Sequence, residues 1–472
     1  MGDLTQDTEL LVIGGGPGGY AAAFRAADLG LEVTIVDEGA RPGGTCLFRG
    51  CIPSKTLLAA TELMYDARRA ASMGLRFDGP RIDLELLRAW KERVIDRLSA
   101  GLVNLSNRRN VQWVQARATF DGPDRVRLQG SDVSRFRFRH AIVAAGSRPV
   151  PLPGVEFEPG GRVMDSAAAL ELAEIPETLL VVGGGYVGLE LGSVYAALGS
   201  RVTLVELGEE LLAGVDRDLA RPLLRRICES FEAVHTRTGV KVVKDGDAGV
   251  EVDLEGAVDH PRLTFDRVLV AIGRRANTEG LGLENTRVRT DERGFVVVNE
   301  QQRTADDRIF AVGDVAGGTM LAHKAMREGR VAAEVIAGQP SAFDVRAIPA
   351  VVYTDPQVAW CGLTEVQAQR EGRPVQVARF PWSASGRAAT MDATDGLTKV
   401  VFDPDSGRVL GMGIAGRGAG ELIGEGVLAV EMGALAQDLA LTVHPHPTLA
   451  ETEGEAAEAF LGSATHLMPA KR

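Results

Sequence analysis

The chain has 472 residues, a length typical of about three domains, and 45% of them are hydrophobic, enough for large cores. Its formal net charge of −12 disfavours nucleic-acid binding, which needs a basic face. The sequence contains no run of about 20 apolar residues, so we expect no membrane span. No basic segment precedes its first apolar run, so we do not expect a signal peptide. Four scattered cysteines do not make a secreted disulfide framework, so we expect a cytoplasmic protein.

The first predicted element is a strand–helix–strand unit over residues 10–38, which read LLVIGGGPGGYAAAFRAADLGLEVTIVDE. Its glycine-rich turn carries the dinucleotide fingerprint at Gly14, Gly16 and Gly19. Such glycines permit a tight turn, the approach of backbone N–H groups to a pyrophosphate, and close packing of helix on strand. The second strand ends at Asp37, about where an acceptor for ribose hydroxyls is expected.

The next segment, residues 43–56, reads GGTCLFRGCIPSKT and contains two cysteines. If it coils into a helical turn, the sulfurs of Cys46 and Cys51 lie close enough to pair. Lys55, one turn beyond Cys51, favours a thiolate. Two unrelated buried cysteines are the alternative, but the pair directly follows the predicted dinucleotide unit. Further ligands at metal-site spacing are missing from the sequence around the pair, so we expect redox chemistry and no metal.

A second copy of the strand–helix–strand pattern follows at residues 179–206, which read LLVVGGGYVGLELGSVYAALGSRVTLVE. It repeats the fingerprint at Gly183, Gly185 and Gly188 and ends at Glu206. One such fingerprint is weak evidence, because structural glycine turns mimic it. Two copies in the same context predict two dinucleotide sites.

The remaining elements close these units and add a C-terminal domain. Residues 138–154 and 265–281 each read as a buried strand followed by an exit rich in glycine or proline. Residues 309–337 read as a strand, a glycine-rich turn with Asp314, and a helix. From about Ile348, alternating strand patterns and one helical stretch predict an α+β domain.

The tail segment VHPHPTLAET offers His444, His446 and Glu451. Thiol–disulfide exchange proceeds through a thiolate, so a cysteine pair needs a base, and a histidine oriented by a carboxylate is the usual one. A single histidine is more often structural. Because the tail is far from the cysteines in sequence, the fold or a second subunit must bring it to them.

Together, GGTCLFRGCIPSK, the two fingerprints, IFAVGDV, MLAHKA and HPTLAE resemble the dihydrolipoamide dehydrogenases of the class I pyridine nucleotide-disulfide oxidoreductase family. The resemblance runs from Leu11 to about Gly462. It implies an α/β fold with two Rossmann-like domains and a homodimer. The implied domains are an FAD-binding domain at 1–150, an NAD-binding domain at 151–280, a central domain completing the FAD site at 281–347, and an α+β dimerisation domain at 348–472.

The resemblance also implies an activity and residue roles. Dihydrolipoamide on a lipoylated acyltransferase or lipoyl carrier protein would be oxidised, with FAD as carrier and NAD as acceptor. Cys46 would exchange with substrate and Cys51 would face the flavin. His446, held by Glu451 and supplied by the second subunit, would be the base. His444 would be its structural neighbour, and Lys55 and Glu190 would form an ion pair near the flavin.

Cofactor contacts complete the implied site. For FAD these are Gly14, Gly16, Gly19, Asp37, Thr45, Lys55, the backbone at Ala116 or Ala118, Gly146, Asp314 and Ala322. For NAD they are Gly183, Gly185, Gly188, Glu206, Val240 and Gly273. Glu206 favours NAD over NADP, because an acid repels the 2′-phosphate.

Some positions depart from the family pattern. Phe48 and Arg49 stand where Asn and Val are usual, Asp37 stands for Glu, and Pro445 stands for Ala. Tyr186 replaces an aliphatic residue, so it either covers the nicotinamide pocket or packs locally. The main alternative function is another flavin disulfide reductase. Mercuric reductases would have a C-terminal cysteine pair, which LMPAKR lacks, and glutathione reductases would have NADP-binding arginines. The intact Cys, His and Glu set argues against a purely assembly role.

Overall fold

The computed structural model describes residues 5–256, 258 and 261–468, which divide into two compact units. The first unit contains the chain up to Thr56 together with Asp83–Val150 and Gly273–Asp344. The second contains Leu57–Ile82, Pro151–Ile272 and the chain from Val345 onward. The division into four domains at 150, 280 and 347 stays a prediction.

The first unit is built on a seven-stranded sheet in the order β3-β2-β1-β6-β5-β4, with β17 paired to β6. Strands β3, β2, β1, β6 and β17 are parallel, whereas β5 and β4 extend the sheet antiparallel. The elements of this unit are β1 (Thr5–Ile13), α1 (Pro17–Asp28), β2 (Val33–Asp37), α2 (Gly44–Arg49), the start of α3 (Cys51–Arg69), α4 (Leu84–Arg108), β3 (Gln112–Gln115), β4 (Arg117–Gly122), β5 (Arg125–Gln129), β6 (Arg135–Val143), β7 (Ser147–Pro149), β16 (Arg274–Ala276), η1 (Leu283–Asn285), β17 (Ile309–Ala311), η2 (Gly313–Ala316) and α8 (Ala322–Ile336).

Both faces of the parallel part of this sheet are buried. Along β1, Leu10 and Val12 belong to one core cluster, and Leu11 and Ile13 belong to the other. Successive strand residues point to opposite faces, so a strand covered on both sides must be apolar throughout. This is why the run LLVI in the sequence is continuous rather than alternating.

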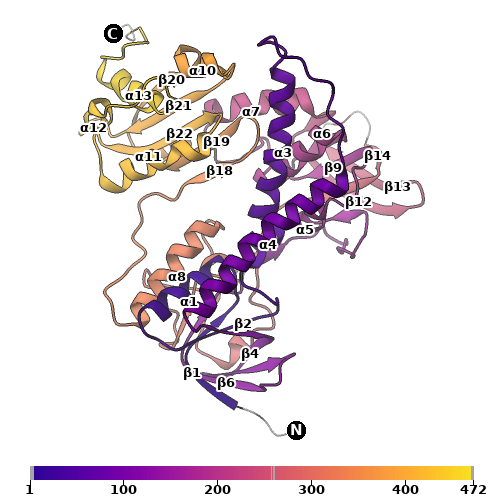
Figure 1. Ribbon diagram of the computed structural model, residues 1–472, viewed down its shortest axis with the longest axis vertical. Coiled ribbons are helices and arrows are strands. Elements are labelled where there is room, and N and C mark those ends of the chain that lie inside the picture. The colour runs from indigo at the N-terminus through magenta and orange to yellow at the C-terminus, as the bar shows by residue number, and fades with distance from the viewer. Residues whose placement is uncertain (1–4, 257, 259–260, 469–472) are drawn as a thin grey trace. The chain divides into compact units, whose positions relative to one another are not determined.

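Helices α1 and α8 lie side by side over one face of this sheet (Figure 1). Both supply small side chains to the same core cluster, including Ala22 from α1 and Ala332 from α8. Their axes approach closely because Gly18 faces Gly329, and a Cβ at Gly329 would collide with the Gly18 carbonyl oxygen. The small residues predicted for the first helix therefore serve helix packing.

The second unit contains a parallel five-stranded sheet in the order β11-β10-β9-β15-β8 and a three-stranded antiparallel sheet, β12-β13-β14. The strand–helix–strand pattern recurs here as β9, α6 and β10, as the repeat predicts. The elements of this part are β8 (Val163–Met164), α5 (Ser166–Glu171), β9 (Thr178–Val182), α6 (Tyr186–Leu198), β10 (Arg201–Val205), α7 (Arg217–Ser230), β11 (Ala233–His235), β12 (Thr238–Gly246), β13 (Gly249–Gly256), β14 (Arg262–Phe265) and β15 (Arg267–Val270).

The C-terminal part of the second unit is an antiparallel sheet in the order β18-β19-β22-β21-β20. Helix α11 packs against β19 and β22, and α13 packs against β20 and β21. This confirms the α+β pattern predicted from Ile348. The elements are β18 (Ala350–Val352), β19 (Gln357–Gly362), α9 (Glu365–Glu371), β20 (Gln376–Pro381), η3 (Trp382–Ala384), α10 (Gly386–Thr390), β21 (Leu397–Phe402), β22 (Val409–Gly416), α11 (Ala419–Met432), α12 (Ala436–Leu441) and α13 (Glu451–Leu461).

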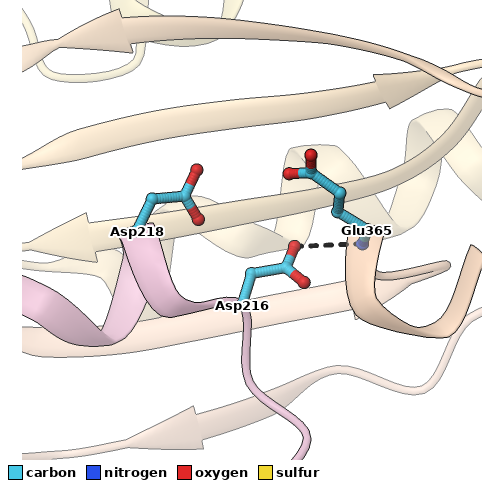
Figure 2. Close-up of side chains that lie close together, drawn as sticks. All are labelled: Asp216, Asp218 and Glu365. Atoms are coloured by element: carbon cyan, nitrogen blue, oxygen red, sulfur yellow. Dashed lines mark hydrogen bonds between the residues drawn. The ribbon is translucent and has the colours of Figure 1, made fainter. Parts of the chain in front are cut away.

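Three carboxylates in the second unit converge from two elements, as Figure 2 shows: Asp216 and Asp218 at the start of α7, and Glu365 at the start of α9. Their charge is met by Lys399 of β21, which is 1% exposed and whose Nζ lies 2.8, 2.9 and 2.7 Å from the three acids in that order. Burial lowers the pKa of Lys399, but these hydrogen bonds raise it above its ordinary value. The cluster is an ion-pair network that joins α7 and α9 to the C-terminal sheet.

Replacing Lys399 with Met should lower the free energy of unfolding by about 3–5 kcal/mol, because the buried Asp216 loses its cation and Asp218 and Glu365 keep only Arg379. Denaturant unfolding of the purified protein measures this change. The control is Lys244→Met, which removes an exposed lysine in the same unit and should change stability by less than about 0.5 kcal/mol. Equal effects of the two substitutions would show that the network contributes nothing to stability.

Candidate functional site

The two cysteines of the redox loop lie on either side of a break between two helices. Cys46 is in α2, Cys51 begins α3, and Gly50 separates them. A Cβ at Gly50 would lie 3.1 Å from the Thr45 carbonyl oxygen and 3.5 Å from the Cys46 Cα, so a side chain at this break would be in tight contact with α2. The Cys46 thiol hydrogen-bonds Cys51, as the spacing of the pair predicts.

The redox loop packs directly on the first glycine turn. The Gly43 N–H donates to the Gly15 carbonyl oxygen at 2.8 Å. A Cβ at Gly44 would collide with the Gly16 Cα. The same backbone contacts therefore hold both the cysteine pair and the turn that the sequence assigns to a dinucleotide.

The surroundings of the cysteines disfavour spontaneous ionisation of Cys46. The hydrogen bond with Cys51 and then burial raise the pKa of the Cys46 thiol, while the Lys55 charge lowers it. Burial and the two cysteines also raise the pKa of Tyr20, on α1, to about 12. Tyr20 was not singled out from the sequence, where it reads as one more helix residue. In the reduced pair Cys46 therefore holds its proton, and attack by Cys46 on a disulfide would need a base.

The first glycine turn is shaped to accept a pyrophosphate. A Cβ at Gly14 would collide with the Ala144 carbonyl oxygen, and one at Gly19 with the Gly14 carbonyl oxygen. In contrast, the nearest atom to a Cβ at Gly16 is 3.9 Å away. Gly16 is also the N-cap of α1 and has no side-chain cap, so the first N–H groups of the helix are available to an anion.

The second turn repeats this geometry. Cβ atoms at Gly183 and Gly188 would collide with backbone carbonyl oxygens, whereas nothing lies within 4 Å of one at Gly185. Gly185 is the uncapped N-cap of α6. The outer glycines are thus required by the fold itself, and the middle glycine leaves the space in front of the helix open.

The acids that end the two strands are also held alike. Asp37 accepts the N–H groups of Gly15 and Gly39, both at 2.6 Å. Glu206 accepts the N–H of Gly184 at 2.6 Å and that of Gly208 at 2.7 Å. Each carboxylate is oriented by its own loop beside its glycine turn and keeps lone pairs for ribose hydroxyls. The residues present therefore fit a dinucleotide at each of the two turns.

The other predicted cofactor residues lie at strand and helix ends. Asp314 accepts the Ser147 hydroxyl at 2.5 Å, and Arg274 Nε donates to the same hydroxyl at 2.7 Å. Gly146 and Gly273, which follow β6 and β15, each have open space where a Cβ would stand. Thr45 is exposed in α2, Ala322 is the first residue of α8, and Val240 is partly buried in β12.

The structure distinguishes the two alanines considered for the adenine. The Ala116 N–H donates to the Asp37 carbonyl oxygen at 2.9 Å, so its backbone lies at the end of β2. Ala118 is buried in β4, where it pairs with Leu128. Ala116 therefore adjoins the strand that ends at Asp37, and the contact of either alanine with adenine stays a prediction.

The two tail histidines have different surroundings. The His446 Nδ1 lies 2.8 Å from Glu451, and 76% of the His446 side chain is exposed. The Thr448 N–H also donates to Glu451 at 2.7 Å. Burial raises the pKa of Glu451, but Thr448 and His446 together hold it below its ordinary value. His446 is thus an accessible imidazole with an ionised orienting partner.

His444, in contrast, is enclosed. Its side chain is 8% exposed, and its Nε2 lies 2.9 Å from Glu425 of α11. Glu425 was not predicted as a partner of His444. The enclosed position agrees with the prediction of His444 as the structural neighbour.

The predicted catalytic residues are divided between the two units. Cys46, Cys51 and Lys55 belong to the first, and Glu190, His446 and Glu451 belong to the second. Glu190 is 3% exposed and accepts the Tyr353 N–H at 2.9 Å. Its ion pair with Lys55 stays a prediction.

The residues that depart from the family pattern are accessible. Phe48 is half-buried with the Arg41 guanidinium 5.5 Å from its ring centroid, and Arg49 is exposed. Tyr186 begins α6 beside the second glycine turn and is 40% exposed. Whether Tyr186 covers the nicotinamide pocket or packs locally stays a prediction.

Glu453 on α13 is a buried acid that no pattern in the sequence indicates. It is 0% exposed, and neither carboxylate oxygen has a hydrogen-bond partner among the residues described. Burial, with the Glu425 charge adding to it, raises the pKa of Glu453 to about 9. The side chain is therefore held neutral at physiological pH.

Glu453→Gln should make stability less sensitive to pH. Because the pKa of Glu453 is raised in the folded state, the folded protein binds a proton that the unfolded chain releases. Stability is then lost as pH rises from about 4.5 to about 9, by up to about 1.4 kcal/mol per pH unit. Denaturant unfolding at pH 5.5, 7 and 8.5 compares the variants. A difference in stability that does not grow with pH would contradict this assignment.

Among the described residues, the structure contains no helix with the length and apolar character of a membrane span.

A family model described as pyridine nucleotide-disulphide oxidoreductase matches residues 8–329, and the dimerisation domain of the same family matches residues 348–457.

Among similar solved structures, LpdA from Mycobacterium tuberculosis has a TM-score of 0.88 at 28% identity, covering 96% of this chain and 99% of that one. The HOCl-induced flavoprotein disulfide reductase RclA from Escherichia coli has a TM-score of 0.84 at 26% identity, covering 95% and 99%.

Curated relatives are more similar in sequence. The dihydrolipoyl dehydrogenase of Thermus scotoductus is 47% identical, covering 98% of this chain and 99% of the relative. That of Vibrio parahaemolyticus is 46% identical over 97% of each, and that of Geobacillus stearothermophilus is 43% identical over 99% of each. With its paired cysteines against one of two matching dinucleotide turns, the chain belongs to the dihydrolipoyl dehydrogenases of the pyridine nucleotide-disulphide oxidoreductase family.

Proposed function

We propose that this protein oxidises dihydrolipoyl groups to lipoyl groups and reduces NAD. The observation that carries the proposal is the Cys46–Cys51 pair, hydrogen-bonded and packed on the first glycine turn. A dithiol–disulfide couple in this position exchanges two electrons with a bound dinucleotide. Membership of the dihydrolipoyl dehydrogenase family identifies the substrate as a dithiol of the lipoyl type.

Two cofactors are held by the two turns. FAD would be held by the first turn, with Asp37, Thr45, Lys55, Gly146, Asp314 and Ala322, and NAD by the second, with Glu206, Val240 and Gly273. When bound, FAD would supply a two-electron carrier between the cysteine pair and NAD, and NAD would supply the hydride acceptor. Glu206 is oriented for ribose hydroxyls, and its charge repels a 2′-phosphate. The nicotinamide cofactor of the second turn is therefore NAD rather than NADP.

The chain's own residues carry out the thiol chemistry. His446, oriented by Glu451, takes a proton from one substrate thiol, and the thiolate attacks Cys46 of the Cys46–Cys51 disulfide. The Cys46–Cys51 bond breaks, and Cys51 leaves as a thiolate near Lys55. The second substrate thiol then displaces Cys46, which closes the lipoyl disulfide and leaves the cysteine pair reduced by two electrons. Lys55, in ion pair with Glu190, stabilises the Cys51 thiolate.

A homodimer completes this site. The dimerisation domain at residues 348–457 contains His446 and Glu451, which we assign to the active site of the other subunit. The exposure of His446 supports this assignment, because an imidazole presented to a partner must be accessible in one chain. We further propose that the lipoyl group is carried by a separate acyltransferase or carrier protein in the cytoplasm.

The activity is tested by purifying the protein and offering it alternative substrates. The protein should be yellow and should reduce NAD with dihydrolipoamide, with NADP at least about tenfold less effective. The competing function is that of another flavin disulfide reductase, which would use NADPH to reduce a disulfide such as that of glutathione. Activity only with NADPH and glutathione disulfide would overturn the proposal.

A further inference from the structure

A cavity of about 480 Å³ lies in the second unit, and its lining contains none of the residues assigned to the active site. It is formed by the segment before β18, the end of β19, α9, the start of β22 and α11. Its volume is in the range of small-molecule sites. The apolar part of its lining consists of Val345, Ile348, Leu363, Val409, Leu410 and Val430.

Three arginines line the same cavity: Arg346, Arg373 and Arg408. Two of them converge on one point, because a Cβ at Gly433 would lie 3.0 Å from the Arg408 Nη1 and 3.6 Å from the Arg346 Nη1. Among the described residues, none of the three guanidinium groups lies within ion-pair distance of a carboxylate. Guanidinium groups that converge without an ion-pair partner favour binding of an anion.

The acidic groups nearby do not fill this role. Glu431 accepts the backbone N–H groups of Arg346 and Ala347 at 2.8 and 3.0 Å, so the main chain holds this carboxylate. Glu371 lines the cavity and accepts the Gln367 side-chain amide at 2.8 Å. Glu371, and Asp403 near Arg373, lie close by, but neither is within ion-pair distance of a guanidinium group, so the donors of the three arginines stay available to a ligand.

We propose that this cavity binds a small organic phosphate. The guanidinium groups match a phosphate, whose three terminal oxygens accept several charge-assisted hydrogen bonds at once, better than a single carboxylate. The six apolar residues would contact the organic body of the ligand. The site is distinct from the two dinucleotide turns, because it is formed entirely by residues 345–430 of the C-terminal part.

Calorimetric titration of the FAD-loaded, full-length protein with phenyl phosphate tests this proposal. Saturating NAD is present so that the probe does not report the second dinucleotide turn. The wild-type protein should bind phenyl phosphate, and Arg346→Gln and Arg408→Gln should each weaken binding at least about tenfold. The matched control, Arg370→Gln, removes an exposed arginine of α9 outside the lining and should leave the affinity unchanged.

Two comparisons distinguish the ligand classes. Inorganic phosphate should bind more weakly than phenyl phosphate, because it lacks the apolar body; equal affinities would overturn the organic part of the proposal. A hexaglutamate peptide that binds when phenyl phosphate does not would overturn it in favour of an acidic protein partner. Equal affinities for wild-type, Arg346→Gln and Arg408→Gln proteins would overturn the site itself. Because all three arginines are exposed, the variants should fold, which their flavin absorbance confirms.

Discussion

Replacing Cys46 with Ser should reduce dihydrolipoamide turnover by about 10⁴-fold or more, because the exchange step loses the sulfur that the substrate attacks. The variant should still bind FAD, since Cys46 supplies none of the proposed FAD contacts. Its remaining Cys51 should still form a thiolate and perturb the flavin absorbance, because we assign Cys51, not Cys46, to the flavin. Steady-state kinetics and a pH titration of the absorbance spectrum measure the two effects separately.

Two further variants control this experiment. Cys228→Ser removes an exposed cysteine of α7 outside the redox loop and should keep wild-type turnover. Cys51→Ser should abolish both turnover and the spectral change. If Cys46→Ser loses the spectral change while Cys51→Ser keeps it, the roles of the two sulfurs are reversed. Wild-type turnover by either variant of the pair would exclude disulfide exchange.

Replacing His446 with Ala should slow thiol exchange by about 10²–10⁴-fold, the usual contribution of a positioned general base. The physical reason is that a substrate thiol must lose its proton before it can attack the Cys46–Cys51 disulfide, and we assign that proton to His446. Stopped-flow reduction of the protein by dihydrolipoamide measures this step directly. Glu451→Gln should slow it less, since it removes only the charge that orients the ring.

His444→Ala is the matched control. It removes a buried imidazole and its contact with Glu425, so it should lower stability more than His446→Ala and slow exchange less. If His444→Ala instead slows exchange more than His446→Ala does, His444 is the base.

A mixing experiment tests where the base comes from. Subunits carrying Cys46→Ser and subunits carrying His446→Ala, each inactive as homodimers, are dissociated and reassociated together. If the base comes from the other subunit, half of the dimers are mixed and each has one intact site, which restores about a quarter of wild-type activity. If each subunit uses its own histidine, one chain of each mixed dimer lacks the cysteine and the other lacks the base, so no activity returns.

Some features of this protein follow from local sequence alone. The βαβ units at both glycine fingerprints could be predicted because an apolar run, a glycine turn and a helix of small residues are determined by neighbouring residues. The close approach of Cys46 and Cys51 could be predicted for the same reason, since the two are five positions apart on one turn of chain. Glu451, the partner of His446, lies only five residues away from it, so this pair could also be predicted from the sequence.

Other features depend on contacts between distant segments. Lys399 could not be recognised as the centre of an ion-pair network, because its three acids come from α7 and α9. Glu453 reads as a surface acid on an acidic helix, and only the packing of α13 on its sheet buries it. The unpaired arginines at 346, 373 and 408 have no pattern in the sequence. Periodicity determines which elements form, but burial and charge pairing depend on which elements meet, and only the tertiary structure decides that.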